Sequence, residues 1–233
     1  MQDIEIYDIN FETSKMFNVE ITNSKLEKNT FTDITFENCN FSNTSFENST
    51  QMYGWEYVNA NQTNHWMVGT DVASAGSRSL YITNNNSSNQ YTVSSASFVC
   101  AYKVLDLESG VYSFSYDWRC YGETIHDYLR VALVPDSIDF EISYAPSGSY
   151  NALPPGWISL DGGKLNLQST WQHNECQINI PHEGKWKLSL LWKNNASYGR
   201  MPPAAVDGIS VRKLAHPIPV SIVGFSENEL YGT

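Results

Sequence analysis

The sequence predicts an all-β protein, with a short stacked β-coil at the N-terminus followed by a jelly-roll-like antiparallel β-sandwich. Apolar residues recur at every fifth position through the first 50 residues, and from about residue 52 short β-rich runs alternate with turn residues. Aromatic residues make up 13% of the chain and charged residues only 17%. This composition favours sheets, because aromatic side chains suit a pleated, half-buried surface.

The N-terminal repeat has a period of five, which matches neither a helix nor a simple strand, so the chain must turn regularly. The apolar positions are Ile6, Phe11, Met16, Ile21, Leu26, Phe31, Phe36, Phe41 and Phe46. Over residues 4 to about 50 this pattern resembles the pentapeptide-repeat family, in which four pentads form one square coil. The resemblance implies a column about 10 to 15 Å tall at the usual strand spacing. A trimeric fibre around a shared Phe-rich axis and an accidental phasing of polar strands and turns are the alternatives.

The β-rich runs between residues 52 and 213 predict the strands of the sandwich. They span 55–59, 65–68, 79–83, 90–93, 98–107, 111–120, 128–134, 176–180, 185–193 and 204–212. A turn at Ser109-Gly110 favours a hairpin between 98–107 and 111–120, because the second run alternates with a period of two. In that hairpin Cys100 and Cys120 would lie opposite one another, either as a disulfide or as two thiols.

The same region carries a second resemblance. The segments concerned are NHWMVGT, SRSLYITN, CAYKVLDLESGVYSFSYDWRCYGE, HDYLRVALVP, LPPGWISLDGGKLNL, WKLSLLWKN and PPAAVDGISV. They are similar to the MAM-like and cleaved-adhesin-like jelly-roll modules of bacterial surface proteins, over about residues 52–213. The resemblance implies a non-catalytic module that lies beside other domains and binds proteins or glycans. Similar modules also decorate phage fibres and heads.

The sequence thus divides into a coil or stalk over 1–51, a sandwich over 52–213 and a C-terminal segment over 214–233. Pro217 and Pro219 mark a linker in this last segment, and 221–225 predicts one more strand. We expect that strand to dock on an edge of its own sandwich, on the end of the N-terminal coil or on a neighbouring subunit.

Charge and hydropathy exclude two classes of partner. The net charge of −11 repels phosphate groups over most of the surface, so we expect no nucleic-acid partner. No run approaches the roughly 18 to 20 apolar residues that a membrane-spanning helix needs, so we expect no membrane insertion. The first 11 residues lack the features of an export signal. The chain is expected to be either part of a longer exported protein or a virion component made in the cytoplasm.

The sequence contains none of the common catalytic motifs: no nucleophile elbow, zinc-binding H-E-x-x-H or phosphate-binding glycine loop. Three carboxylates, Asp117, Glu123 and Asp127, lie near Arg119 and Arg130 in the sequence. We interpret this group as a structural ion-pair network, because nothing else supports a glycosidase pair. The chain is therefore predicted to be non-catalytic.

Candidate ligand-binding residues are aromatics that strand burial does not claim. Trp157 follows Pro-Pro-Gly, Trp171 lies in a predicted Ser-Thr-Trp-Gln loop, Tyr121 and Tyr198 lie near turns, and Arg200 is a polar neighbour. Sugar rings stack their apolar faces on such rings, and guanidinium groups bind hydroxyls. The alternative is that the tryptophans close the ends of the core.

Two carboxylates are candidate ligands of a structural Ca²⁺ ion. Glu56 lies in the first strand of the predicted sandwich and Asp207 at the start of the last. The jelly-roll resemblance implies a calcium ion held between such ends, and carboxylate oxygens are the ligands that Ca²⁺ prefers.

The resulting prediction is a non-catalytic recognition module on a phage fibre or other virion surface, where it binds a host-surface glycan or protein. Sister subunits are expected partners, with a homotrimer as one arrangement. One alternative is a module of an exported bacterial cell-surface adhesin, located outside the cell. Another is a purely structural decoration protein without a sugar ligand.

Overall fold

The computed structural model describes residues 54–140 and 153–214 in full, and between residues 5 and 42 the backbone of eight three-residue strands. The described residues contain strands and turns but no helix. The described residues between 54 and 214 form two five-stranded sheets in which all strand pairs are antiparallel. The predicted all-β, jelly-roll-like sandwich is confirmed.

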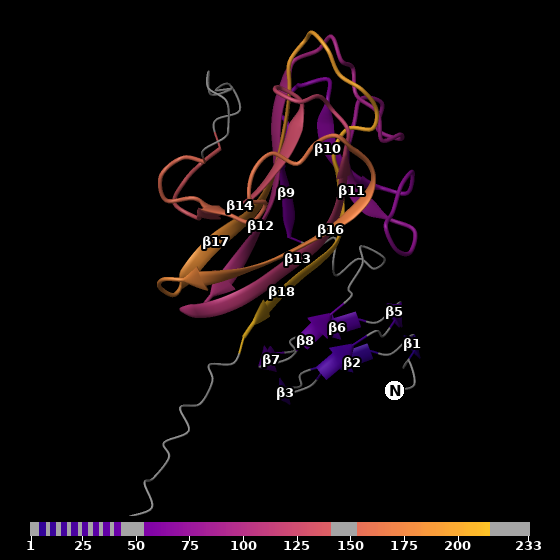
Figure 1. Cartoon of the computed structure of the whole chain (residues 1–233). Helices are drawn as coiled ribbons and strands as arrows, with labels where there is room; N and C mark the ends of the chain where they lie inside the picture. Colours follow the sequence, from indigo (N-terminus) through magenta and orange to yellow (C-terminus); the bar gives the residue numbers. More distant parts are fainter. Residues whose placement is uncertain are drawn as a thin grey trace, which may run out of the picture.

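The two sheets face each other as the layers of the sandwich (Figure 1). The first sheet has the order β10 (His65–Gly69), β11 (Ser79–Thr83), β18 (Ala205–Lys213), β13 (Gly110–Cys120) and β16 (Gln168–Ile180). The second has the order β15 (Ile158–Ser159), β14 (Tyr128–Pro135), β17 (Gly184–Asn194), β12 (Ser97–Leu107) and β9 (Trp55–Val58). Strands that follow one another in the sequence often lie in opposite sheets.

The core lies between the sheets and is rich in aromatic residues. Alternate residues of β13 are buried there, as the period of two predicts: Tyr112, Phe114, Tyr116 and Trp118. The facing strands β14 and β17 contribute Leu129, Val131, Leu133, Trp186, Leu188, Leu190 and Trp192. This apolar burial is the main favourable free energy that holds the two layers together.

The predicted hairpin between 98–107 and 111–120 is wrong. β12 pairs with β17 and β9, whereas β13 pairs with β16 and β18. The chain crosses from one sheet to the other between these strands, and Gly110 takes the left-handed φ of 137° at this crossing. Cys100 and Cys120 consequently lie in different sheets, and both are free thiols. Alternation of apolar residues marks the buried face of each strand. The pattern does not show whether the next strand pairs with it in the same sheet or lies in the opposite sheet.

Two strand boundaries also differ from the prediction. Residues 90–93 form no strand: 90–92 are irregular, and a turn begins at residue 93. β16 begins at Gln168, well before the predicted start at 176. β16 is an edge strand, so polar side chains are tolerated along most of its length, and its first half lacks the apolar alternation that marks a strand in sequence.

The N-terminal strands pair in parallel with a constant offset of 20 residues. The pairs are β1 (Glu5–Tyr7) with β5 (Lys25–Glu27), β2 (Asn10–Glu12) with β6 (Thr30–Thr32), β3 (Lys15–Phe17) with β7 (Thr35–Glu37), and β4 (Glu20–Thr22) with β8 (Asn40–Ser42). This is the register that a coil of four five-residue sides requires. The resemblance to the pentapeptide-repeat family itself stays a prediction. The predicted docking strand 221–225 lies outside the described residues.

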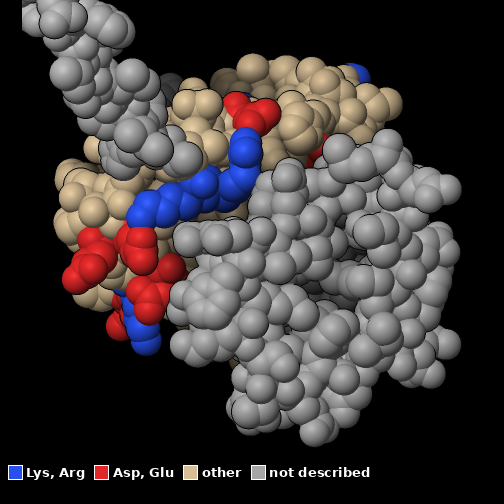
Figure 2. Space-filling model, turned by 90° about the horizontal axis from the view of Figure 1, so that it is seen from below, with Lys and Arg blue, Asp and Glu red and all other residues tan. Residues whose placement is uncertain are grey.

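The view of the molecule from below shows Lys and Arg side chains lying directly beside Asp and Glu side chains (Figure 2). Charges of both signs are therefore interspersed on the described surface of this side. The described part of the chain also holds no helix with the length and apolar character that a membrane crossing requires.

Candidate functional site: a pocket between three loops

Three loops meet at one end of the sandwich. They are residues 121–127 after β13, 160–167 before β16 and 195–204 between β17 and β18. The strand register brings them together, because Cys120 is opposite Gln168, Arg119 is opposite Ala205, and Tyr128 is opposite Lys193. Loops carried by a rigid sandwich are the usual place for binding residues.

A pocket of about 370 Å³ opens between these loops. Its lining residues are Tyr121, Gly122, Glu123, Thr124, Leu167, Tyr198, Gly199 and Arg200. The structure therefore brings together three residues that the sequence singled out separately: Tyr121, Tyr198 and Arg200. The volume lies within the range of small-molecule sites.

Backbone hydrogen bonds fix the three loops to one another. Gly122 and Arg200 exchange N–H···O bonds of 3.1 and 3.0 Å, so the first and third loops form a short antiparallel bridge. The N–H of Leu167 donates to the carbonyl oxygen of Tyr121 at 2.8 Å, which attaches the second loop. The pocket is thus held by the main chain, and substitution of a lining side chain leaves these bonds in place.

The side chains around the pocket combine aromatic, apolar and cationic groups. The guanidinium carbon of Arg200 lies 5.9 Å from the centroid of the Tyr121 ring, which is a cation–π distance. The side chain of Tyr198 is 80% exposed and Leu167 is 44% exposed. Leu167 also has a left-handed backbone with φ of 59°, a conformation that costs a non-glycine residue about 1 kcal/mol or more. Strain of this kind is typical of functional loops.

A buried hydrogen-bonded pair forms the base of the pocket. Asp127 is fully buried; one carboxylate oxygen accepts the Tyr91 hydroxyl at 2.7 Å, and the other accepts the Asn195 N–H at 2.9 Å. Burial raises the pKa of Asp127 to about 6, against the lowering effect of these two hydrogen bonds. A Cβ atom at Gly199 would lie only 1.8 Å from the Tyr91 hydroxyl oxygen. Glycine therefore allows the third loop to lie directly on the pair.

The second carboxylate at the pocket is occupied by its own loop. Glu123 accepts the backbone N–H groups of His126 at 2.5 Å and of Ile125 at 3.2 Å. The Asn166 amide donates to the Glu123 carbonyl oxygen at 2.7 Å, which links this turn to the second loop. Both carboxylates near the pocket thus stabilise loop conformation.

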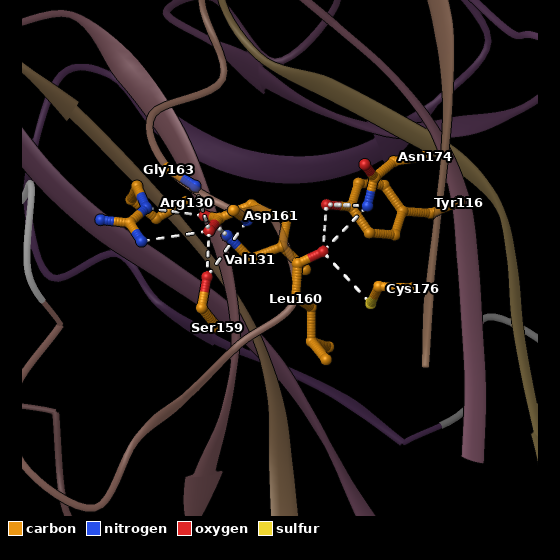
Figure 3. A network of polar contacts seen from close by, with 10 residues as sticks. Tyr116, Arg130, Val131, Ser159, Leu160, Asp161, Gly163, Asn174 and Cys176 are labelled. Carbon is orange, nitrogen blue, oxygen red and sulfur yellow. Dashed lines mark hydrogen bonds and ion pairs between the residues drawn. The ribbon is translucent and has the colours of Figure 1, made fainter. Parts of the chain in front are cut away.

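The second loop is anchored between the two sheets by a polar joint at Leu160 and Asp161 (Figure 3). Asp161 forms a buried ion pair with Arg130 of β14, with 2.6 Å between Nε and Oδ2, and also accepts the Val131 N–H at 2.8 Å. Ser159 and Gly163 donate to its other oxygen. The joint therefore ties the loop to the second sheet.

The carbonyl oxygen of Leu160 ties the same loop to the first sheet (Figure 3). It accepts the Tyr116 hydroxyl at 3.1 Å and the Asn174 amide at 2.8 Å, with the Cys176 sulfur at 3.5 Å. These donors come from β13 and β16. Leu160 and Asp161 are adjacent in this loop and contact different sheets. The two sheets therefore fix the position of the loop that leads to Leu167.

The two predicted tryptophans lie elsewhere. Trp157 is half-buried against Phe140, with ring centroids 5.7 Å apart in an edge-on arrangement. Trp171 is a residue of β16, not of a loop as predicted, and the Arg119 guanidinium lies 5.7 Å from its ring centroid. Trp157 thus packs against Phe140, and Trp171 packs against Arg119 on a face of the first sheet. Neither tryptophan lines the pocket.

The predicted calcium ligands are not brought together. Glu56 lies in β9 of the second sheet, where it accepts the Tyr102 hydroxyl at 2.5 Å. Asp207 lies in β18 of the first sheet, where its carboxylate accepts the N–H groups of Ser74, Ala75 and Gly208. Three N–H donors leave little of this carboxylate for a cation. Within the described residues no group of three or more His, Cys, Asp or Glu side chains could hold a metal ion.

The predicted carboxylate–arginine network also has different partners. Arg130 pairs with Asp161, and Arg119 donates to the Asn89 side chain at 2.7 Å. Asp117 is 2.7 Å from the His173 ring nitrogen. These geometries agree with the interpretation as structural contacts, but the partners differ from those expected from proximity in sequence.

Three important residues of the site were not predicted. Leu167 is exposed because of its left-handed backbone, which no residue pattern reveals. Gly199 and Asp127 are packed together by tertiary contact between loops 72 residues apart in number, which periodicity cannot show. The Tyr-Gly-Arg run at 198–200 is the one local signal, because glycine between two large polar residues often marks a close approach of the backbone.

No protein-family model matches the chain. The curated proteins contain no match either. Among solved structures, the chain is similar to the C-terminal family 22 carbohydrate-binding module of Clostridium thermocellum Xyn10B, at 14% identity with a TM-score of 0.45, over 75% of this chain and 94% of that one.

Two further solved structures show similarity at the same level. TmCBM61, solved in complex with beta-1,4-galactotriose, has 9% identity and a TM-score of 0.42, over 70% of this chain and 90% of that one. The enzymatically active domain of bacteriophage CBA120 tailspike protein 4 has 10% identity and a TM-score of 0.42, over 90% of this chain and 37% of that one. All three TM-scores are low, so none of these likenesses carries an inference about what this chain binds.

Proposed function

We propose that the sandwich is a non-catalytic glycan-binding module and that its site is the pocket between the three loops. The observation that carries the proposal is the convergence of Tyr121, Tyr198 and Arg200 on one cavity. Tyrosine rings present flat apolar faces on which the C–H faces of a sugar stack, and a guanidinium group donates directional hydrogen bonds to sugar oxygens.

The positions of the carboxylates support a binding role over hydrolysis. A glycosidase needs two carboxyl groups that flank the scissile bond. Asp127 is fully buried beneath Gly199, and the carboxylate of Glu123 accepts hydrogen bonds from two amides of its own turn. Neither group is presented to the pocket as a free acid or base, so we propose that a bound glycan is held without being cleaved.

The glycan or glycoprotein would be on a host surface, with the module on a phage fibre or on a bacterial cell-surface adhesin. The 20-residue register of the N-terminal strands supports a stalk-like element in either setting. The molar mass of the full chain from light scattering distinguishes the two settings. We expect a homotrimer if the chain is part of a fibre and a monomer if it is a single adhesin module. A structural Ca²⁺ ion remains a prediction.

The proposal is tested on a glycan array with Tyr121→Ala and Tyr198→Ala variants of the full chain. We expect the wild-type protein to bind a defined subset of glycans, and each variant to bind them about tenfold more weakly or worse, because a stacking ring has been removed. Both variants should retain the wild-type melting temperature, since the loops are joined through their backbone.

Two matched aromatic substitutions serve as controls. Tyr57→Ala removes a tyrosine that is 42% exposed on β9, outside the pocket. Trp171→Ala removes the tryptophan on the open face of the first sheet. Both should leave glycan binding unchanged. Loss of binding in Trp171→Ala, with binding retained in the two pocket variants, would place the site on the sheet face and refute the proposed pocket.

A further inference from the structure

The guanidinium group of Arg200 is held in position and has no partner of its own. It lies over the Tyr121 ring, and among the described residues it forms no hydrogen bond or ion pair with a side chain. The Arg200 backbone is fixed at the same time by its two bonds to Gly122. A guanidinium presents its N–H donors in a planar fork that matches the two oxygens of a carboxylate.

The surroundings of the pocket are locally basic in a chain with a net charge of −11. Lys164 donates to the carbonyl oxygen of Ile125 at 2.9 Å, which places a cation on the loop that forms one wall. Lys193 lies nearby in β17; burial lowers its pKa, and the charge of Lys164 adds to this effect. Lys164 and Arg200 thus place two cationic side chains on the loops that form the pocket.

The two carboxylates at the same end, Glu123 and Asp127, already accept hydrogen bonds from the protein. Glu123 lines the pocket, but its carboxylate oxygens accept the N–H groups of the 123–126 turn. Asp127 is buried beneath Gly199 and holds the Tyr91 hydroxyl. An anionic ligand at Arg200 would therefore meet a guanidinium group, and the one carboxylate in the pocket lining, Glu123, has its oxygens engaged by two backbone N–H groups.

On this basis we propose that the pocket selects sugars that carry a carboxylate, such as uronic or sialic acids, and that Arg200 binds the carboxylate. The inference rests on the proposed glycan-binding function and adds the chemical class of the ligand. Tyr121 and Tyr198 would stack on the ring, while the Arg200 fork would bind both carboxylate oxygens. A neutral sugar would keep the stacking contacts and lose the paired charge.

The experiment measures the affinity of the full chain for matched acidic and neutral oligosaccharides by titration calorimetry. One pair is an oligogalacturonate and the same oligosaccharide after reduction of its carboxylates to alcohols. The second pair is sialyllactose and lactose, so the two pairs separate uronic from sialic acids. We expect the acidic member of one pair to bind about tenfold more tightly or better, and this preference to shrink at high salt because of charge screening.

Three variants show whether Arg200 causes the preference. Arg200→Gln should reduce the ratio of acidic to neutral affinity to about one, and Arg200→Lys should give an intermediate ratio, because the ammonium keeps the charge without the planar fork. Arg212→Gln is the matched control: it removes the same charge from an exposed position on β18, near the opposite end of the strand from the pocket. Its ratio should equal that of the wild type.

Failure of the carboxylate preference and failure of glycan binding would give different experimental results. Equal affinity of the wild type for acidic and neutral partners, or a preference that survives in Arg200→Gln, would overturn the carboxylate inference and leave glycan binding in place. Absence of binding to every glycan on the array would instead refute the proposed function itself.

Discussion

Protonation of Asp127, which lies beneath the lining residue Gly199, makes the stability of the fold depend on pH. Its pKa is raised to about 6 from the ordinary value of about 4 because the carboxyl group is buried. The fold therefore favours the protonated form. This stabilising contribution is complete below pH 4 and is lost as the pH rises through 6, and a shift of two pH units corresponds to about 3 kcal/mol.

We predict that Asp127→Asn abolishes this part of the pH dependence. Urea unfolding at several values between pH 4 and pH 7 should show the wild type losing up to about 3 kcal/mol relative to the variant as the pH rises. Tyr91→Phe should instead increase the stability lost between pH 4 and pH 7. The Tyr91 hydroxyl stabilises the ionised carboxylate, so its removal raises the pKa of Asp127 further. A free-energy difference between wild type and Asp127→Asn that stays constant with pH would contradict the assignment.

At the scale of the element, the loop of residues 160–167 depends on its joint at Asp161. Replacing Asp161 with Asn removes the carboxylate that pairs with the buried guanidinium of Arg130, and breaking a buried ion pair typically costs about 3 to 5 kcal/mol. We therefore expect the melting temperature of Asp161→Asn to fall by roughly 10 °C. Differential scanning calorimetry gives this value directly.

Ser159→Ala is the control for the same loop. It removes only one neutral donor to the Asp161 carboxylate, so a loss of about 1 kcal/mol is expected. Similar melting temperatures for the two variants would show that the ion pair contributes no more than a single hydrogen bond, contrary to the role given to the joint.

Elements with a buried face could be predicted from sequence, whereas their partners could not. The alternation of Tyr112, Phe114, Tyr116 and Trp118 locates β13 correctly, because burial imposes a period of two. The partner of β13 is set by packing between layers, and so the expected hairpin with β12 was wrong. The edge strand β16 was found only in its second half, because solvent on its outer side allows polar residues there.

The site could be predicted in the same partial way. Tyr121, Tyr198 and Arg200 were selected as polar and aromatic residues near turns, and the fold brings all three to one pocket. Trp157 and Trp171 satisfy the same criterion, but Trp157 packs against Phe140 and Trp171 lies on a face of the first sheet. Residue type and turn proximity identify candidates; only the strand register decides which candidates meet.

For the whole molecule, the buried side chains of the main core all come from residues between Trp55 and Val206. We predict that a fragment of residues 52–214 folds without the N-terminal coil and the C-terminal segment. Its circular dichroism should show β-structure, and its melting should be cooperative and within a few degrees of the full chain. Non-cooperative melting of the fragment would contradict the predicted domain boundary at residue 52.

The direction of β13 separates the pocket from the site where the described chain ends. Cys120 closes β13 beside the pocket, while the N–H of Leu214 donates to Val111 near the other end of the strand, about 30 Å away for nine extended residue steps. A fragment that ends at Leu214 and is captured on a sensor surface through that residue will consequently be held at the end of the sandwich away from the pocket. Immobilisation in that orientation gives even long polysaccharides unobstructed access.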